Sequence, residues 1–326
     1  METREIGGAR VSAVGLGCMG MSGTYGPADE TESIATIHAA MEAGITLLDT
    51  GDFYGAGHNE TLVGRAIAGK RDRVFLSVKF GALLRPQGGI VGFDGRPEAV
   101  RSFLTYTLRR LGTDHVDLYQ PARVDPKVPI EETVGAVKEL IEAGYVRHLG
   151  LSEAGAATVR RAHAVHPVAA LQTEYSLATR DPEREVLATL RELGIGLVAY
   201  GVFARGLLTG DVTPASRLAP GDLRAHSPRF QGENLQQNLR LVEALTEVAR
   251  ETGLTPGQLS LAWVLSRGSD VVPLLGTKRR ERLAESLAVL DRPLPPEVLA
   301  RLEAAVPAGA VAGTRYPAAA MTNVEA

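Results

Sequence analysis

A regular alternation of short apolar runs with longer amphipathic segments is the feature that most constrains this chain. The apolar runs are almost wholly hydrophobic rather than alternating, which is typical of strands that crossover helices cover on both faces. Eight strand-then-helix units in succession favour a closed parallel (β/α)8 barrel, a TIM barrel, over an open sheet. The predicted strands are Val14–Gly17, Thr46–Asp49, Val74–Lys79, Val116–Gln120, Val146–Leu151, Ala170–Gln172, Gly196–Tyr200 and Val271–Pro273.

Two of the intervening segments show the helical pattern most clearly. Apolar residues recur at spacings of three and four within Pro97–Leu111 and Ile130–Ile141, which predicts helices with one buried stripe. Gly112 and Gly144 follow these helices, where glycine commonly ends a helix. We expect a single barrel domain over residues 1–326, because barrels of about 250 residues or more fold as one domain and no linker divides the chain.

Three segments interrupt the alternation. Arg4–Ser12, with two glycines in its middle, predicts a short β-hairpin before the first barrel strand. Gly81–Arg96 is predicted to be a glycine-rich loop after the third strand, and Leu207–Gln236 a long polar loop after the seventh. Loops that follow barrel strands lie at the carboxyl-terminal face, where barrels build their active sites.

Composition narrows the choice of partners and compartment. A net charge of −3 gives no electrostatic footprint for nucleic acid or for an anionic membrane. No apolar run approaches the roughly 20 residues that span a bilayer, and the first residues lack the apolar core of a signal peptide. The single cysteine, Cys18, cannot form an internal disulfide. We therefore expect a cytoplasmic protein that acts on a small molecule; the sequence indicates no oligomeric state.

Asp49, Tyr54 and Lys79 stand where a barrel would place catalysts. Asp49 and Lys79 end the second and third predicted strands, and Tyr54 lies in the loop after Asp49. Taken singly, each has an ordinary structural explanation: Asp49 as a turn residue, Tyr54 as a packing ring, and Lys79 as the exit of a buried strand into water. Together they converge on one mouth, where Asp49 would keep Lys79 charged and Lys79 would lower the pKa of the Tyr54 phenol. This predicts Tyr54 as a proton donor near neutral pH.

Five stretches in the same order along the chain resemble those of aldo-keto reductases, and the likeness runs from near residue 4 to near residue 290. That resemblance implies that Asp49, Tyr54 and Lys79 are catalytic, with hydride passing from NADPH to a carbonyl carbon and Tyr54 protonating the oxygen. The stretches are Val14–Gly20, Leu48–Gly55, Asp117–Gln120, Gly144–Ser152 and Val272–Lys278.

The chain departs from the family pattern at Ala122. Members usually carry His-Arg-Val-Asp-Pro after the fourth strand, and the histidine orients and polarises the carbonyl; this chain has Ala122 followed by Arg-Val-Asp-Pro. Alanine cannot donate a hydrogen bond, and losing such a donor can lower the rate on the order of 100-fold.

Several interpretations of Ala122 remain open. The enzyme can be a slow carbonyl reductase of a larger substrate that relies on Tyr54 alone, which we favour. His58 can supply the missing donor, or the small side chain can admit a conjugated alkene or an imine. A catalytically weak, cofactor-binding regulatory subunit is a further alternative, since relatives with this fold serve as redox-sensing partners, but the retained Asp49, Tyr54 and Lys79 argue against it.

Residues 15–20 match the dinucleotide fingerprint G-x-G-x-x-G, but a true fingerprint opens a helix directly, and here a loop follows. The resemblance instead places these residues beside the nicotinamide of a barrel site, with Cys18 as a buried neighbour and not a nucleophile. It assigns Gly17, Cys18, Met19 and Asp49 to the nicotinamide, Ser152 and Gln172 to its carboxamide, Tyr200 to its ring face, and Gly201, Phe203, Arg205 and Gly206 to the pyrophosphate. Glu153 replaces the commoner asparagine.

The basic run from Gly276 to Arg282 is the physical argument for NADPH over NADH. It carries four cations within five residues and opens a helix, where backbone N–H groups and the helix dipole favour anions. The resemblance puts Thr277, Lys278 and Arg282 near the 2′-phosphate and Glu285 near the adenine. A metal-assisted isomerase or lyase is the alternative enzyme class, but the seven histidines form no convincing ligand set, so we predict no metal.

Overall fold

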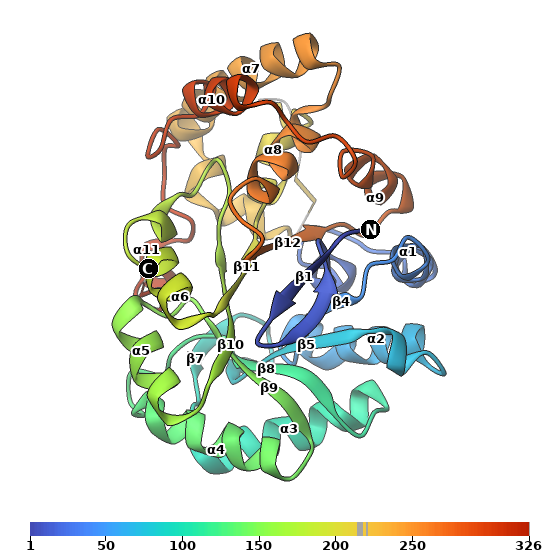
Figure 1. The fold of residues 1–326 in the computed structure, drawn as a ribbon, viewed down its shortest axis with the longest axis vertical. Helices are drawn as coiled ribbons and strands as arrows, with labels where there is room; N and C mark the ends of the chain where they lie inside the picture. The colour runs from blue at the N-terminus through green and yellow to red at the C-terminus, as the bar shows by residue number, and fades with distance from the viewer. Residues whose placement is uncertain (214–217, 220, 326) are drawn as a thin grey trace.

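The structure, a computed structural model, describes residues 1–213, 218–219 and 221–325. Eight parallel strands close into a barrel in the order β10-β11-β12-β3-β4-β5-β8-β9 (Figure 1). Each of them overlaps one of the eight predicted strands, so the predicted TIM barrel is confirmed. The strands are β3 (Gly15–Gly17), β4 (Leu47–Gly51), β5 (Phe75–Phe80), β8 (Val116–Pro121), β9 (Val146–Ser152), β10 (Val168–Glu174), β11 (Gly196–Tyr200) and β12 (Val271–Gly276).

Helices form the outer layer around this barrel (Figure 1). The two helices with the clearest sequence pattern form as predicted: the first begins at Pro97 and is followed by Gly112 in the left-handed conformation, at φ 64°. The helices are α1 (Glu30–Glu42), α2 (His58–Ile67), α3 (Pro97–Leu111), α4 (Ile130–Glu142), α5 (Ala156–Val165), α6 (Val186–Leu193), α7 (Gly232–Thr252), α8 (Pro256–Leu265), α9 (Arg280–Leu287), α10 (Pro296–Ala305) and α11 (Ala318–Met321).

The predicted N-terminal hairpin, β1 (Thr3–Ile6) and β2 (Ala9–Ser12), is also confirmed. Its Ile6 and Val11 are fully buried and pack with apolar side chains from inside the barrel, which closes the amino-terminal end. Gly7 in the turn has φ 53°, and a Cβ there would lie 2.4 Å from the Cβ of Ala169. Only glycine fits this approach.

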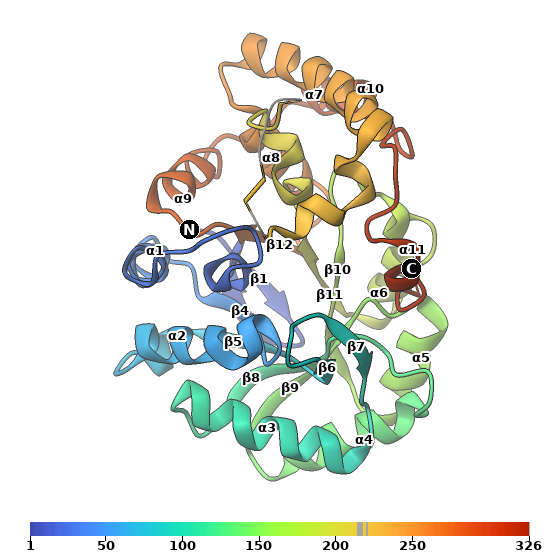
Figure 2. The same ribbon diagram turned by 180° about the vertical axis from the view of Figure 1, so that it is seen from behind.

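The predicted glycine-rich loop at Gly81–Arg96 is wrong in part. It contains an antiparallel pair, β6 (Ala82–Leu84) and β7 (Ile90–Phe93), drawn in front in Figure 2. Leu83, Leu84 and Ile90 are exposed, so backbone pairing rather than burial forms these strands, and the sequence shows no alternating apolar face.

The second predicted loop, residues 207–236, contains short 3-10 turns and leads into α7 at Gly232. The turns are η5 (Ala204–Thr209), η6 (Leu223–His226) and η7 (Pro228–Phe230), and residues 214–217 and 220 lie outside the described residues. Both this segment and the β6–β7 pair follow barrel strands, as predicted for the carboxyl-terminal face.

After α10, the C-terminal tail (residues 306–325) returns to the barrel, and α11 lies near α5 and α6 (Figure 2). The Glu325 amide donates to the Glu153 carbonyl at 3.2 Å, and its carboxylate accepts from the Gly155 amide at 2.9 Å. The tail is thereby attached to the loop after β9. Within the described ranges, no helix combines the length and apolar character needed to cross a membrane.

Candidate active site

Asp49 and Lys79 form a buried ion pair at the carboxyl-terminal end of the barrel. β4 and β5 pair in a register that sets Asp49 beside Ser77 and Gly51 beside Lys79. The Lys79 Nζ lies 2.5 Å from Asp49 Oδ1, and the two side chains are 5% and 4% exposed. The predicted convergence of these two strand ends is therefore present in the structure.

Two neutral side chains complete the hydrogen bonding of this pair, and a third supports one of them. Asp49 Oδ2 accepts from Ser77 Oγ at 2.9 Å and from Gln172 Nε2 at 2.7 Å, while Gln172 Oε1 accepts from Lys79 at 3.1 Å. Gln120 Nε2 donates to Ser77 Oγ at 2.9 Å. We call Asp49, Ser77, Lys79, Gln120 and Gln172 the barrel cluster.

Sequence reasoning missed Ser77 and Gln120. A signal was present at Ser77, because residues two apart on a strand point to the same face and Lys79 follows it by two. Gln172 was predicted to bind the carboxamide of the cofactor, yet both ends of its amide are engaged inside the barrel cluster. Gln120 Oε1 is buried without a hydrogen-bond partner among the described residues.

Tyr54 lies in the 3-10 turn η2 (Tyr54–Gly57) directly after β4, where it is 7% exposed. The Lys79 Nζ is 5.2 Å from the centre of its ring. Burial raises the pKa of Tyr54 well above its usual value, Asp49 adds to the rise, and Arg123 opposes it. The expected lowering of this pKa is therefore wrong in direction: loss of hydration outweighs nearby positive charge. The phenol stays protonated.

Burial also acts on the ammonium group. It lowers the pKa of Lys79 below its usual value, while Asp49 counteracts the shift through charge and a direct hydrogen bond. The ammonium group donates to both Asp49 and Gln172, so the charged form of Lys79 has hydrogen-bond acceptors although it is buried.

Ala122 follows β8 and is 1% exposed, so the position of the usual histidine carries a buried methyl group. His58, the alternative donor, does not join the barrel cluster. Its Nε2 lies 2.9 Å from Glu30 Oε1, its Nδ1 lies 2.9 Å from Ser22 Oγ, and its side chain is 42% exposed. Both ring nitrogens are engaged at the rim.

The residues assigned to the cofactor lie at or just after the carboxyl ends of strands. Cys18 is fully buried, as predicted, and its amide donates to the Asp49 carbonyl at 2.9 Å. Burial raises the pKa of its thiol, which does not favour a nucleophile. Gly17, Cys18 and Met19 end or follow β3; Ser152 ends β9; Gln172 is in β10; Tyr200 ends β11; Gly201, Phe203, Arg205 and Gly206 follow it; Gly276 ends β12; Thr277 and Lys278 follow; and Arg282 and Glu285 are in α9.

Glu153 holds the C-terminal tail. Its carboxylate is fully buried. Both of its oxygens accept from the Arg315 guanidinium group, at 3.0 and 3.2 Å, although the two residues are 162 positions apart in sequence. It also accepts from the Glu174 amide at 3.0 Å, and its backbone has φ 56°. Sequence reasoning missed Arg315, although a glutamate at a strand end needs a cation and the tail after Pro307 has one basic residue.

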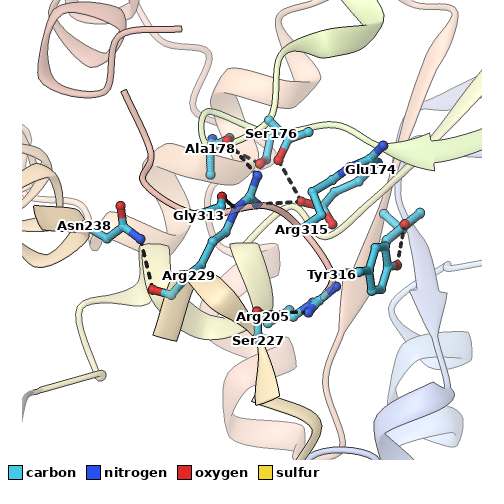
Figure 3. Close-up of polar contacts among 12 residues, drawn as sticks. Glu174, Ser176, Ala178, Arg205, Ser227, Arg229, Asn238, Gly313, Arg315 and Tyr316 are labelled. Atoms are coloured by element: carbon cyan, nitrogen blue, oxygen red, sulfur yellow. Dashed lines mark hydrogen bonds and ion pairs between the residues drawn. The ribbon is translucent and has the colours of Figure 1, made fainter. Parts of the chain in front are cut away.

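A second buried ion pair, between Glu174 and Arg229, lies beside Arg315 (Figure 3). Arg229 donates to Glu174 at 2.8 Å and to the Gly313 carbonyl at 3.4 Å, so this pair also touches the tail. Tyr316, next to Arg315, has its hydroxyl 2.8 Å from that of Tyr200. We call Glu153, Glu174, Arg229, Arg315 and Tyr316 the tail cluster.

At the predicted phosphate end, α9 begins at Arg280, inside the basic run. Lys278 donates to the backbone of the loop before α1, and Arg282 pairs with Asp211 at 2.7 Å and Glu285 at 2.9 Å. Within the described ranges, Arg205 and Arg279 pair with no carboxylate. A depression of about 420 Å³ lies beside Arg279, lined by Glu32, Arg279, Arg280 and Glu281. Arg280 pairs with Glu32 at 2.8 Å, so the depression has both signs of charge, and only Arg205 and Arg279, of the described arginines at this end, remain as unpaired candidates for contacts with the phosphates of a dinucleotide.

Comparison with known proteins gives a consistent result. A sequence model of the aldo/keto reductase family matches residues 13–307. A probable aldo-keto reductase of Glycine max is 45% identical over 313 residues, which cover 95% of this chain and 89% of that protein. An aldo-keto reductase of Schizosaccharomyces pombe designated for NADP(+) is 40% identical, over 99% of this chain and 96% of that protein.

Solved structures agree. A glycerol dehydrogenase of Gluconobacter oxydans has a TM-score of 0.84 at 30% identity, covering 94% of this chain and 96% of that one. An aldo/keto reductase of Klebsiella pneumoniae, solved with NADP and acetate, has a TM-score of 0.74 at 27% identity, covering 97% and 98%.

Proposed function

The chain belongs to the aldo/keto reductase family, and we propose that it is an NADPH-dependent oxidoreductase that reduces an aldehyde or ketone with Tyr54 as proton donor. The observation that carries the proposal is the Tyr54 ring lying 5.2 Å from the ammonium group of the buried Lys79–Asp49 pair. A protonated phenol beside a fixed positive charge suits the transfer of a proton to a developing alkoxide.

Tyr54 and four residues of the barrel cluster have distinct roles in this proposal. Tyr54 holds the proton, because burial keeps its pKa high, and passes it to the substrate oxygen. Lys79 stabilises the phenolate that remains. Asp49 holds Lys79, and Ser77 and Gln172 hold Asp49 through hydrogen bonds of 2.9 and 2.7 Å. Fixed donors of this kind need no rearrangement during the reaction.

NADPH, when bound, supplies the hydride. We propose that Gly17, Cys18, Met19, Ser152 and Tyr200 contact its nicotinamide end. The NADP(+) designation of the yeast relative and the NADP bound to the Klebsiella protein support this choice over NADH. For the phosphates, the proposed contacts are Gly201, Phe203, Arg205, Gly206, Gly276, Thr277, Lys278 and Arg282, with Glu285 near the adenine.

Ala122 favours a second candidate, reduction of a conjugated alkene or an imine. Its buried methyl group cannot donate a hydrogen bond to a carbonyl oxygen. This position therefore adds no second donor to Tyr54 for the substrate oxygen. A panel of saturated aldehydes, ketones, enones and imines, assayed by NADPH oxidation, separates the two candidates by the class that is turned over.

Tyr54→Phe tests the proposed donor. We expect kcat to fall about 100- to 10,000-fold, the usual contribution of a general acid, with NADPH affinity unchanged. Tyr106→Phe, on the exposed face of α3, is the matched control and should retain the activity of the unaltered protein. Full activity in Tyr54→Phe would exclude this residue as the donor.

A further inference from the structure

Positive charge exceeds negative charge around the tail cluster. Among the described residues, two buried carboxylates there face four arginines. Glu153 is matched by Arg315 and Glu174 by Arg229, with contacts of 3.0 and 2.8 Å. The other two arginines, Arg123 and Arg205, form no ion pair with a carboxylate in the described part of the chain. Glu153 and Glu174 act on them only at longer range. Two guanidinium groups are therefore left without a balancing anion.

These two guanidinium groups share Tyr316 but reach it from different parts of the barrel. The guanidinium carbon of Arg205, in the turn after β11, lies 4.6 Å from the centre of the Tyr316 ring. That of Arg123, directly after β8, lies 5.6 Å from the same centre. Our proposed function assigns Arg205 to a cofactor phosphate, so Arg123 still lacks an anion.

Arg123 lies at the mouth of the barrel, beside the strand end that carries Lys79. The amide of Ala122, the residue before it, donates to the carbonyl of Phe80, the residue after Lys79, at 2.8 Å. From this position the charge of Arg123 opposes the rise that burial and Asp49 cause in the pKa of Tyr54. Its own hydrogen bonds are few: it donates to the Ala122 carbonyl at 2.6 Å and to the Tyr316 hydroxyl at 3.3 Å. A guanidinium group has five N–H donors in a planar fork, and that fork matches a carboxylate in particular.

We propose that Arg123 binds a carboxylate of the substrate, so that the enzyme prefers oxo acids to neutral carbonyl compounds of the same length. This inference rests on the proposed carbonyl reduction and assigns the substrate class at the same site. Arg123 is then a residue that determines specificity, held in place by Tyr316 of the tail. The tail, through Arg315 and Glu153, keeps Tyr316 beside Arg123.

The test compares free acids with their methyl esters. 4-Oxobutanoate, 5-oxopentanoate and 6-oxohexanoate are each assayed with NADPH against the corresponding ester, which has the same chain but no charge. We expect kcat/KM to favour the free acid about 10-fold or more for at least one length. In Arg123→Leu, kcat/KM for that acid should fall about 10- to 100-fold, as for loss of a hydrogen bond to a charged group, while the ester changes little.

Two further variants sharpen the result. Arg123→Lys keeps the charge but not the fork and should retain part of the preference. Arg109→Leu removes an equal charge from the exposed face of α3 and should leave the preference intact. Equal unfolding temperatures of the variants would show that each one folds.

Three results would overturn the inference. Equal losses for acids and esters in Arg123→Leu would mean that Arg123 acts on the carbonyl itself. Equal kcat/KM for acids and esters of every length in the unaltered protein would show no anion preference, while carbonyl reduction would stand. If neither class is reduced, the proposed function fails, and the anion site is tested separately by calorimetry with glutarate on the NADPH-loaded protein. Glutarate binding that Arg123→Leu abolishes would support the anion site. No glutarate binding would overturn it.

Discussion

The barrel cluster and the tail cluster each bury a charged carboxylate with a cationic partner, but they bring that partner from different parts of the fold. In the barrel cluster, Asp49 meets Lys79 across two adjacent strands, 30 positions apart in sequence. In the tail cluster, Glu153 meets Arg315 across 162 positions, and the arginine lies on a segment without a strand or helix. The first pair is fixed by the backbone pairing of its two strands. The second depends on side-chain contacts and on a few isolated hydrogen bonds that attach the tail, such as that from the Glu325 amide to the Glu153 carbonyl. We therefore expect the first to be rigid and the second to open more easily.

The largest expected effect comes from breaking the rigid pair. Lys79→Met leaves the Asp49 carboxylate buried without its cation, on a strand that cannot move into water, so we expect the protein to lose about 3–5 kcal/mol of unfolding free energy. Urea denaturation at neutral pH measures it. Lys127→Met, at an exposed position, should change stability by less than about 0.5 kcal/mol. A similarly small loss in Lys79→Met would show that Asp49 is readily hydrated.

A smaller effect is expected for the tail pair. In Arg315→Leu the tail can lift away and let water reach Glu153, so we expect a loss of about 1–3 kcal/mol, the cost of an unsatisfied polar group. The tail should also become more sensitive to limited proteolysis. Lys79→Met should not increase cleavage of the tail when the two variants are compared under conditions where the same fraction of each is folded.

The matched control for that variant is Arg301→Leu. It removes an exposed pair with Glu251 at 2.6 Å, where the expected loss is at most about 1 kcal/mol and the tail should stay protected. If Arg315→Leu is as destabilising as Lys79→Met, with no change in proteolysis, the two clusters do not differ in rigidity.

The same contrast explains how much could be predicted from the sequence. Barrel strands are buried on both faces, so their apolar runs stand out, and all eight could be found. Asp49 and Lys79 end such runs, and parallel strand ends meet at one mouth, so their pairing followed from the fold. The residue after β8 could also be identified as Ala122, because a recognisable motif surrounds it.

The remainder depends on contacts that no local pattern encodes. The path of the tail decides that Arg315 reaches Glu153 and that Tyr316 reaches Tyr200. The direction of the Tyr54 pKa shift depends on how completely the phenol is buried, which a loop sequence does not state. The β6–β7 pair forms through backbone hydrogen bonds with exposed side chains, so hydrophobic periodicity could not reveal it.

The measurement that tests the central claim most directly is a titration of the purified protein with NADPH and, separately, with NADH, followed by nucleotide fluorescence. It needs no knowledge of the substrate. We predict saturable NADPH binding at micromolar concentrations and much weaker NADH binding, because Arg282 and its neighbours in the basic run would meet the 2′-phosphate. Binding of neither nucleotide would contradict the proposed oxidoreductase, although the barrel itself would stand.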